Sequence, residues 1–524
     1  MAQPDFPPIY QRISRLTAAL SQDLFEKDKA IRLALLSSVA GESIFLLGPP
    51  GVAKSMIARR LKHAYAGARA FEYLMGKFST PDEVFGPVSI SKLKNEDKYE
   101  RLTDKYLPGA NIVFLDEIWK SSPPIQNSLL TVLNEKIYRN GEQEIHVDIR
   151  GLIAASNELP LSGEGLEALW DRFLIRMLVR GIQDDQAFNE MITLPAKSQY
   201  QDLVPESLKI TAEEYQHWQE EIDEVEVPPH VLGLINHLRR SIRERNSSLD
   251  VSAALFVSDR RWRKIVQLLR ASAFLHGRTA VNVMDCFLVI DCIWNKPDQR
   301  EEVEALVTGS VVSYGYRKFV NMQPLRDEIE SLRKEIERET RVVKMEVVPE
   351  RKVYPDPAGE KYFKLEKFWG TDPAYIKVAD FQRLKADEEL FVPIFEMHTR
   401  SFRPFQNYGL KAGSSTSIWY KNKEIKVKVE RIERETITTK PPEEAALKIW
   451  SRQTDKMLEI VRLFLDEIEG QKIRETPGLA HHLFISQRYA AHIHESIANT
   501  VNEILNLKLE IEKVQHSYET IAAN

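Results

Sequence analysis

The pattern of apolar and polar positions divides the chain into parts of different texture. In the first third, short apolar runs end abruptly at Gly, Asp or Asn, which is typical of buried parallel strands. These runs cover residues 44–47, 112–115 and 152–156, with two further strands expected near 70–73 and just after 173. Helical periodicity lies between them, notably over 11–40, 56–65 and 123–136. The alternation predicts an α/β fold with a five-stranded parallel sheet and helices on both faces.

Two insertions into this pattern read as β-hairpins. One covers residues 86–103, within a longer segment that lacks simple periodicity. The other covers 138–149, where Asn140-Gly141 supplies a tight turn before an alternating run. A long ordered insertion of the first kind is more often functional than decorative.

The pattern in the remaining two thirds of the chain predicts a helical domain, followed by segments that serve as structural support. Residues 183–306 predict an all-α domain after the core of residues 1–182. Heptad-spaced apolar stripes then predict a three-helix stalk from residues 307–340 and 441–524. Residues 341–440 interrupt it with prolines, aromatic residues and alternating runs, including an expected hairpin at 417–432. This texture predicts a small β-rich domain inserted in the stalk.

Composition is that of an ordinary soluble protein. Hydrophobic residues make up 43% and charged residues 28% of the 524 residues, and the net charge of −5 disfavours a general nucleic-acid binder. Cys286 and Cys292 would lie on different faces of a helix, so we expect small buried thiols and no disulfide between them. The chain shows no secretory signal and no apolar run of about 18 residues. We therefore expect a soluble cytoplasmic protein without an integral membrane segment.

The segment GPPGVAKS at residues 48–55 stands between an expected strand and an expected helix. This context identifies a phosphate-binding loop, whose backbone N–H groups and following helix N-terminus attract an anion. Lys54 would reach the β- and γ-phosphates of ATP, and the Ser55 hydroxyl would bind Mg²⁺. The glycine usual before the lysine is Ala53. The expected nucleotide contacts are Gly48, Gly51, Val52, Ala53, Lys54, Ser55 and Met56.

Polar side chains follow two other expected strands. Asp116 and Glu117 come directly after the run 112–115, at the edge where open α/β sheets place ligands. Asp116 would hold Mg²⁺ and Glu117 would polarise the attacking water, although acidic pairs are also common at helix starts. Asn157 follows the strand 152–156 and either orients this water or forms a turn.

Three further residues have two interpretations each. Phe25 precedes the first strand and either stacks on adenine or packs as a core aromatic. Arg172 lies just before the fifth strand and is either a salt-bridge partner or a charge donor to a phosphate bound by a neighbouring subunit. Arg260 begins a helix and either faces the nucleotide or is a solvated helix start, with Arg261 as the alternative.

The C-terminal third offers weaker candidates. His481, His482, His492 and His494 cluster near the last helix, without the ordered ligand spacing that zinc favours. We expect them at the surface or at an interface. Lysines of residues 421–428 would bind an acidic partner or form a solvated strand face.

The order of the nucleotide-site motifs along the chain resembles that of a AAA+ ATPase of the MoxR group. Several sequence segments are similar to those of the regulatory ATPase variant A (RavA) subfamily. These segments are GPPGVAKSMIARRLK, STPDEVFGP, FLDEIWK, AASNELP and VSDRRW. The resemblance implies a P-loop core and an all-α lid. It implies that Lys54 and Ser55 form Walker A, Asp116 and Glu117 form Walker B, and Asn157 is sensor 1. Arg172 then resembles an arginine finger acting in trans, and Arg260 resembles sensor 2.

The family resemblance also implies partners. It implies a homo-oligomeric ring, usually a hexamer, that binds ATP or ADP with Mg²⁺ and acts like a chaperone on client protein complexes. A separate protein with a von Willebrand factor A (VWA) domain would assist it. The β-rich insert resembles that of the RavA subfamily in position, and in some members an amino-acid decarboxylase docks there.

Two other functions stay open on the sequence. In one, ATP controls the assembly of a scaffold whose β-rich insert sequesters a partner enzyme. In the other, the chain is a nucleic-acid motor. The first insertion carries Lys92, Lys94 and Lys98 but also Glu96 and Asp97, and this mixed charge disfavours a loop that follows phosphates.

Overall fold

The computed structural model describes residues 7–160, 165–194, 201–247, 254–317, 320–368, 372–399, 401–479 and 481–523. These residues form two compact units. Unit 1 comprises Met1–Leu325 and Met457–Leu509, and unit 2 comprises Arg326–Lys456 and Glu510–Asn524. We describe each unit separately.

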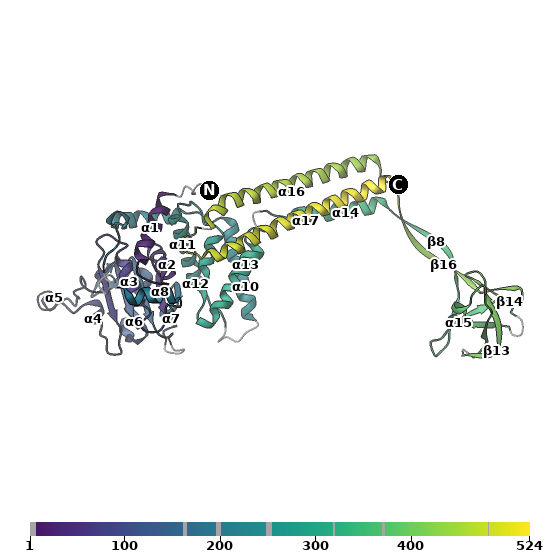
Figure 1. Ribbon diagram of the computed structural model, residues 1–524, viewed down its shortest axis with the longest axis horizontal. Helices are drawn as coiled ribbons and strands as arrows, with labels where there is room; N and C mark the ends of the chain where they lie inside the picture. The colour runs from purple at the N-terminus through teal and green to yellow at the C-terminus, as the bar shows by residue number, and fades with distance from the viewer. Residues whose placement is uncertain are drawn as a thin grey trace. The chain divides into compact units, whose positions relative to one another are not determined.

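A five-stranded parallel sheet in the order β2-β3-β6-β1-β7 forms the centre of unit 1 (Figure 1). All residues of β1 and β6 are buried, which accounts for their uninterrupted apolar runs. The five-stranded parallel sheet predicted from the sequence is confirmed. Its strands are β1 (Ser43–Leu47), β2 (Ala70–Leu74), β3 (Ile112–Asp116), β6 (Gly151–Ser156) and β7 (Ile175–Leu178).

Helices pack around this sheet. Helix α2 contacts β1 and β6, and α3 contacts β3. Two prolines begin α6, where the missing N–H groups cost nothing. The helices of this region are α1 (Pro8–Ser21), α2 (Asp28–Val39), α3 (Lys54–Lys62), α4 (Pro81–Phe85), α6 (Pro123–Glu135), α7 (Glu167–Trp170) and α8 (Asp185–Thr193).

One of the two predicted hairpins is wrong. Residues 86–103 contain a short helix, α5 (Ile90–Glu96), and their strand pairing is limited to the isolated bridge between Val88 and Arg101. Ser89 caps the helix by accepting a hydrogen bond from the Lys92 N–H, and left-handed Asp97 ends it. These capping residues outweigh the short alternation on which the hairpin was predicted.

The other predicted hairpin is confirmed. Strands β4 (Ile137–Asn140) and β5 (Gln143–His146) pair antiparallel. Gly141 in their turn has a φ of +64°, and a Cβ there would lie 2.5 Å from the carbonyl oxygen of Tyr99. The tip of the hairpin therefore packs closely against the end of the first insertion. Asn140 strengthens this contact because it bonds both the N–H and the carbonyl of Arg101.

The lid of unit 1 is helical, as predicted. Thr211 and Glu214 form a capping box at the start of α9, and Ser258 caps α11. Cys286 and Cys292 are buried free thiols, as expected. The α-helices are α9 (Ala212–Glu224), α10 (Pro229–Ser247), α11 (Asp259–Leu275), α12 (Ile290–Ile293) and α13 (Arg300–Tyr314).

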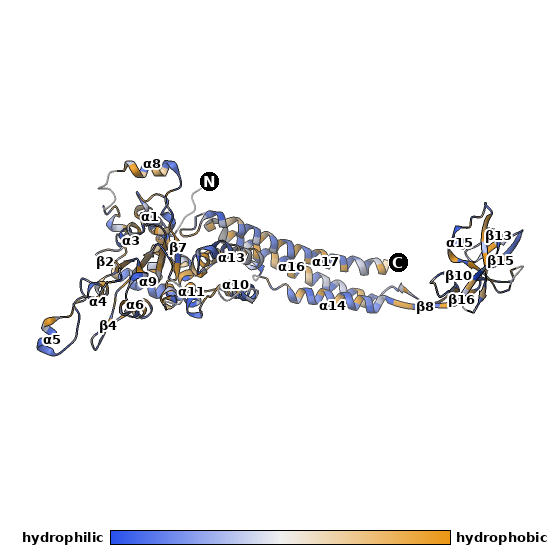
Figure 2. Cartoon of the chain, turned by 90° about the horizontal axis from the view of Figure 1, so that it is seen from below, coloured by the Kyte–Doolittle hydropathy of each residue, from blue (hydrophilic) through white to orange (hydrophobic). Residues whose placement is uncertain are grey.

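Three further helices bear the predicted apolar stripes, and their hydrophilic and hydrophobic residues interleave along each helix (Figure 2). They are α14 (Gln323–Thr340), α16 (Glu444–Leu479) and α17 (Ala490–Ala523). In unit 2 they meet around Trp450, whose indole N–H donates to Glu335 at 3.0 Å and whose ring contacts Tyr518. None of the described helices combines the length and the apolar character that crossing a membrane requires.

The segment between α14 and α16 is β-rich, as predicted. A two-stranded ribbon of β8 (Arg341–Arg351) and β16 (Val429–Thr439) leads to a seven-stranded antiparallel sheet. The expected hairpin is formed by β14 and β15. The sheet comprises β9 (Val353–Pro355), β10 (Lys361–Leu365), β11 (Ala374–Lys377), β12 (Leu390–His398), β13 (Ser401–Ala412), β14 (Ser417–Tyr420) and β15 (Lys423–Lys426), with α15 (Val378–Arg383) after β11.

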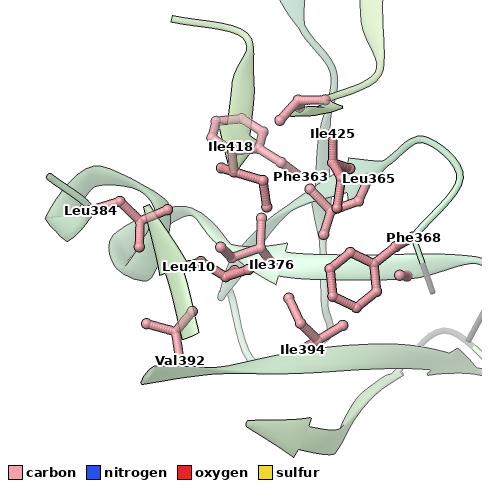
Figure 3. Packing of buried hydrophobic residues seen from close by; sticks show 12 residues of the cluster. Phe363, Leu365, Phe368, Ile376, Leu384, Val392, Ile394, Leu410, Ile418 and Ile425 are labelled. Carbon is pink, nitrogen blue, oxygen red and sulfur yellow. The ribbon is translucent and has the colours of Figure 1, made fainter. Parts of the chain in front are cut away.

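This β-rich segment has a hydrophobic core of its own. Figure 3 shows the side chains converging, with Ile376, Ile394, Leu410 and Ile418 fully buried. A hydrogen bond from Lys428 N to the Lys364 carbonyl at 2.8 Å brings the chain after β15 back to β10, so the sheet curls around this core.

Candidate functional site

The phosphate loop lies between the end of β1 and the start of α3. A Cβ on Gly48 would lie 2.2 Å from the carbonyl oxygen of Val179, so the close approach of β7 requires glycine here. Ala53 has a φ of +66°, in the left-handed region that favours glycine. The glycine usual at this position therefore has a conformational reason, and Ala53 adopts the same backbone at a cost of about 1 kcal/mol.

Lys54 is buried at the centre of the site. Its Nζ donates to the carbonyls of Gly48 at 2.6 Å and Pro49 at 3.0 Å, and to Asn157 Oδ1 at 3.0 Å. Burial lowers the pKa of the Lys54 ammonium, while Asp116 and Glu117 act in the opposite direction. The two carboxylates therefore lie close enough to Lys54 to stabilise its charge.

The sheet order explains why these residues meet. Because β6 lies between β3 and β1, Asn157 at its end stands between the acidic pair and the loop. Asp116 ends β3 and accepts a 3.0 Å hydrogen bond from the Glu117 N–H. Glu117 has a φ of +51°, which turns the chain sharply at the strand end. Its carboxylate contacts Lys120 Nζ at 3.2 Å and Ser156 Oγ at 3.4 Å.

Ser55 and Met56 occupy the first turn of α3, directly after Lys54, and both are half-buried. Hydroxyl and carboxylate oxygens are ligands that Mg²⁺ accepts, so Ser55 and Asp116 are of the right chemical type for this ion.

An apolar cavity of about 380 Å³ opens beside the loop. Phe25, Val52, Ala53 and Met56 are among the residues that line it. Further lining residues were not predicted from the sequence, among them Ile182 and, from α8, Phe188 and Met191. The spacing of Phe188 and Met191, three residues apart on α8, was the sequence feature that could have indicated a shared apolar face.

Glu26 connects two of the segments that line this cavity. Its carboxylate accepts hydrogen bonds from the backbone N–H groups of Gln183 and Asp184, at 2.7–3.0 Å. These bonds lower the pKa of Glu26 and attach the segment that leads into α8 to the segment that carries Phe25. A mainly apolar cavity of this kind, next to a phosphate loop, suits a nucleobase.

Arg172 and Arg260 lie together, away from these residues. Ser43 Oγ at the start of β1 donates to the Arg172 carbonyl at 3.1 Å, so Arg172 stands at the amino edge of the sheet. The phosphate loop begins at the opposite edge, roughly 15 Å away for a five-residue strand. Arg260 Nη2 donates to Asp171 Oδ2 at 2.6 Å. With its amide oxygen turned toward them, Asn134 accepts from both arginines at 3.0–3.2 Å.

Arg261 differs from Arg260 in its surroundings. Its side chain is 2% exposed and bonds Asp171 at 2.7 Å and Asn295 at 3.2 Å, whereas the Arg260 side chain is 40% exposed. Ser258 Oγ also bonds Asp171. Asp171 therefore connects the core to the start of α11 through three residues of the lid.

Two of the four C-terminal histidines belong to α17, and His482 is buried rather than at the surface. His482 and His276 approach Asp285 closely enough to suggest a metal site. However, Arg278 bonds both oxygens of Asp285, His482 Nε2 bonds Asp285 Oδ1, and Leu483 N donates to His276 Nε2. The ring nitrogens and the carboxylate are already used, so these residues form a hydrogen-bonded anchor for the chain before α17 and not a metal centre.

Comparison with known proteins agrees with this arrangement. Residues 11–220 match the model of the MoxR domain in the MoxR-vWA-beta-propeller ternary systems, and residues 230–307 match a AAA lid domain. Two uncharacterized proteins of Methanocaldococcus jannaschii, MJ0079 and MJ0812, are each 34% identical to this chain. The matches cover 55% and 62% of this chain, and 72% and 83% of those proteins, respectively.

A structural protein of Acidianus two-tailed virus, ORF618, is 32% identical over 34% of this chain and 31% of its own length. A crystal structure from Cytophaga hutchinsonii, described provisionally as an ATPase, covers 57% of this chain and 86% of its own, with 18% identity and a TM-score of 0.44. The likeness to the RavA subfamily stays a prediction. The chain belongs to the MoxR family of AAA+ ATPases.

Proposed function

We propose that this chain hydrolyses ATP with Mg²⁺ at the loop of residues 48–55 and uses the cycle to remodel protein complexes. The observation that carries the proposal is the convergence of Lys54, Asn157 and the pair Asp116-Glu117 at one edge of the sheet. A site for binding alone would need the loop and the lysine. A carboxylate and an amide beside them add what the hydrolysis of a phosphoanhydride requires.

Each residue then has a specific task. Lys54 exchanges its two loop carbonyls for β- and γ-phosphate oxygens, and Ser55 and Asp116 hold the metal. When bound, Mg²⁺ neutralises charge on the phosphates. Glu117 accepts a proton from the attacking water, and Asn157 orients this water. Phe25, with Val52 and Met56, encloses the base. Gly48 and Gly51 let the backbone approach the phosphates.

Arg172 and Arg260 act on the nucleotide of a neighbouring subunit. Both lie at the sheet edge opposite to the loop of their own chain, so they do not reach their own γ-phosphate. Their guanidinium groups share Asn134, which suggests that they approach one phosphate together. The proposal therefore includes a closed ring of identical subunits, of which a hexamer is the expected form.

The matched domain model is named for systems with a vWA protein, which supports a VWA-domain partner for this chain. The β-rich segment has its own core and is the natural docking module, for a client or for an enzyme such as a decarboxylase. A nucleic-acid motor is less favoured, because Lys92 and Lys98 of the first insertion are paired with Glu100 and Glu96.

The proposal is tested by Glu117→Gln. This substitution keeps the size of the side chain and removes the base, so ATP binding should stay near the wild-type value while hydrolysis falls by about 100-fold or more. Phosphate release and equilibrium binding of a fluorescent ATP measure the two effects. Lys54→Ala, which should lose binding as well, is the control. Substantial turnover by Glu117→Gln would remove this residue from its role, and wild-type protein without ATPase activity would contradict the proposed function.

A further inference from the structure

The lid carries a cavity that the nucleotide site does not use. Its volume is about 560 Å³, within the usual range for ligand pockets. One face of α10 forms most of its wall, because Gly233, Asn236, Arg240 and Arg243 are spaced at three or four residues and project on the same side. Tyr314 at the end of α13 also lines the cavity, and none of these residues belongs to the phosphate loop.

The charge of this cavity is strongly positive. Helix α10 carries four arginines and one acid, Glu244. Arg239 pairs with Asp259 at 2.8 Å, and Arg245 pairs with Glu302 at 2.5 Å. Within the part of the chain that the structure describes, Arg240 and Arg243 form no ion pair.

Such a row of cations is unfavourable without a counter-ion. Like charges three or four residues apart on a helix repel each other, and Arg243 stands at these distances from both Arg240 and Arg239. His237 stacks on Tyr314 with ring centroids 4.8 Å apart, which fixes the aromatic wall. Burial lowers the pKa of His230 to about 4, so the positive charge at neutral pH comes from the arginines alone.

We propose that this cavity binds a small anion with several adjacent phosphate groups, such as a diphosphate or triphosphate. Arg239, Arg240 and Arg243 fall within about 6 Å along the helix axis. That length matches a ligand whose charges lie on neighbouring groups, and guanidinium forks bind phosphate oxygens in pairs. An acidic peptide would spread the same charge over a longer stretch than these three arginines cover.

The test is calorimetric titration of the full chain carrying Lys54→Ala, which removes the main phosphate ligand of the nucleotide loop. The probes are phosphate, pyrophosphate and tripolyphosphate at two salt concentrations. Tripolyphosphate should bind most tightly and lose affinity at higher salt. Adding R240Q/R243Q should weaken binding at least tenfold. The matched control is Arg263→Gln, an exposed lid arginine outside the cavity, which should change nothing.

R240K/R243K protects the test against a folding defect, because it keeps both charges and should bind with intermediate affinity. Three results would overturn the proposal: no binding of tripolyphosphate at millimolar concentration, equal binding by the R240Q/R243Q variant, or binding of hexaglutamate but not of tripolyphosphate. The readout contains no ATP hydrolysis, so the outcome is independent of the function proposed above.

Discussion

Arg260 of the lid donates a 2.6 Å hydrogen bond to Asp171 of the core, directly beside Arg172. This contact places an arginine from each of two domains side by side, and we propose that both act on the nucleotide of a neighbouring subunit. The same aspartate also holds Arg261, which is buried. Asp171 therefore separates the two consecutive arginines into an accessible one and a structural one.

The first prediction concerns these two arginines. Arg260→Ala should abolish most ATP hydrolysis and change the free energy of unfolding by no more than about 1 kcal/mol, because a partly exposed ion pair contributes little. Arg261→Ala should lower the free energy of unfolding by about 3 kcal/mol, because it removes a buried side chain whose guanidinium compensates the charge of Asp171 and bonds Asn295. Urea unfolding and phosphate release measure the two quantities.

The opposite result is informative as well. If Arg261→Ala kept the stability of the wild type and lost hydrolysis, Arg261 would be the residue that contacts phosphate. Arg239→Ala is a suitable control, since Arg239 pairs with the neighbouring Asp259 and has no assigned part in hydrolysis.

The second prediction concerns the apolar cavity. Phe25→Ala should raise the KM for ATP by roughly tenfold with little change in kcat, because base stacking is worth about 1–3 kcal/mol and does not change during phosphoryl transfer. Phe25→Leu should have a smaller effect. Steady-state kinetics measure both values. Phe391→Ala, an exposed phenylalanine of the β-rich segment, should behave as the wild type. A fall in kcat at constant KM would show that Phe25 positions the phosphates instead.

The third prediction concerns pH. Burial lowers the pKa of His482 and lowers that of His276 well below its usual value, so both are neutral when folded. The unfolded chain takes up protons as the pH falls below about 6.5, and the folded chain does not. The stability that these residues contribute is therefore complete above pH 6.5 and is lost toward pH 5.

Thermal unfolding followed between pH 7.5 and 5 should show this loss, and the variant H276Q/H482Q should show a flatter profile. His217, which is 67% exposed, provides the control through His217→Gln. An equally steep profile in the double variant would assign the pH dependence to other groups.

Local signals in the sequence were sufficient to predict the parallel sheet and the site residues at the carboxyl ends of its strands. Lys54, Asp116 and Asn157 each follow or border a buried strand, and parallel strands bring such ends together whatever the loops between them do. Phe25 was recognisable as a candidate because it precedes the first strand. The MoxR assignment depended on the same motifs.

Other features depend on contacts between distant segments, and no local pattern carries them. The bond of Arg260 to Asp171 spans 89 residues and that of His482 to Asp285 spans 197 residues. Residues 183–306 were predicted as one all-α domain, whereas Phe188 and Met191 of this range line the cavity beside Phe25 because Glu26 bonds the backbone that leads into their helix. At residues 86–103, capping by Ser89 decided between a helix and a hairpin, and a short alternating run was weaker evidence.

The most direct test of the shared site is the ATPase activity of mixed subunits. Arg172→Ala keeps its own loop, and Lys54→Ala keeps its arginine. Each should be nearly inactive alone, since a trans arginine contributes about 10³–10⁵ in rate. Random mixing creates complete sites at about one interface in four of a head-to-tail ring. We predict activity that rises on mixing and peaks near equal amounts. No recovery at any ratio, in assemblies shown to exchange subunits, would contradict the account.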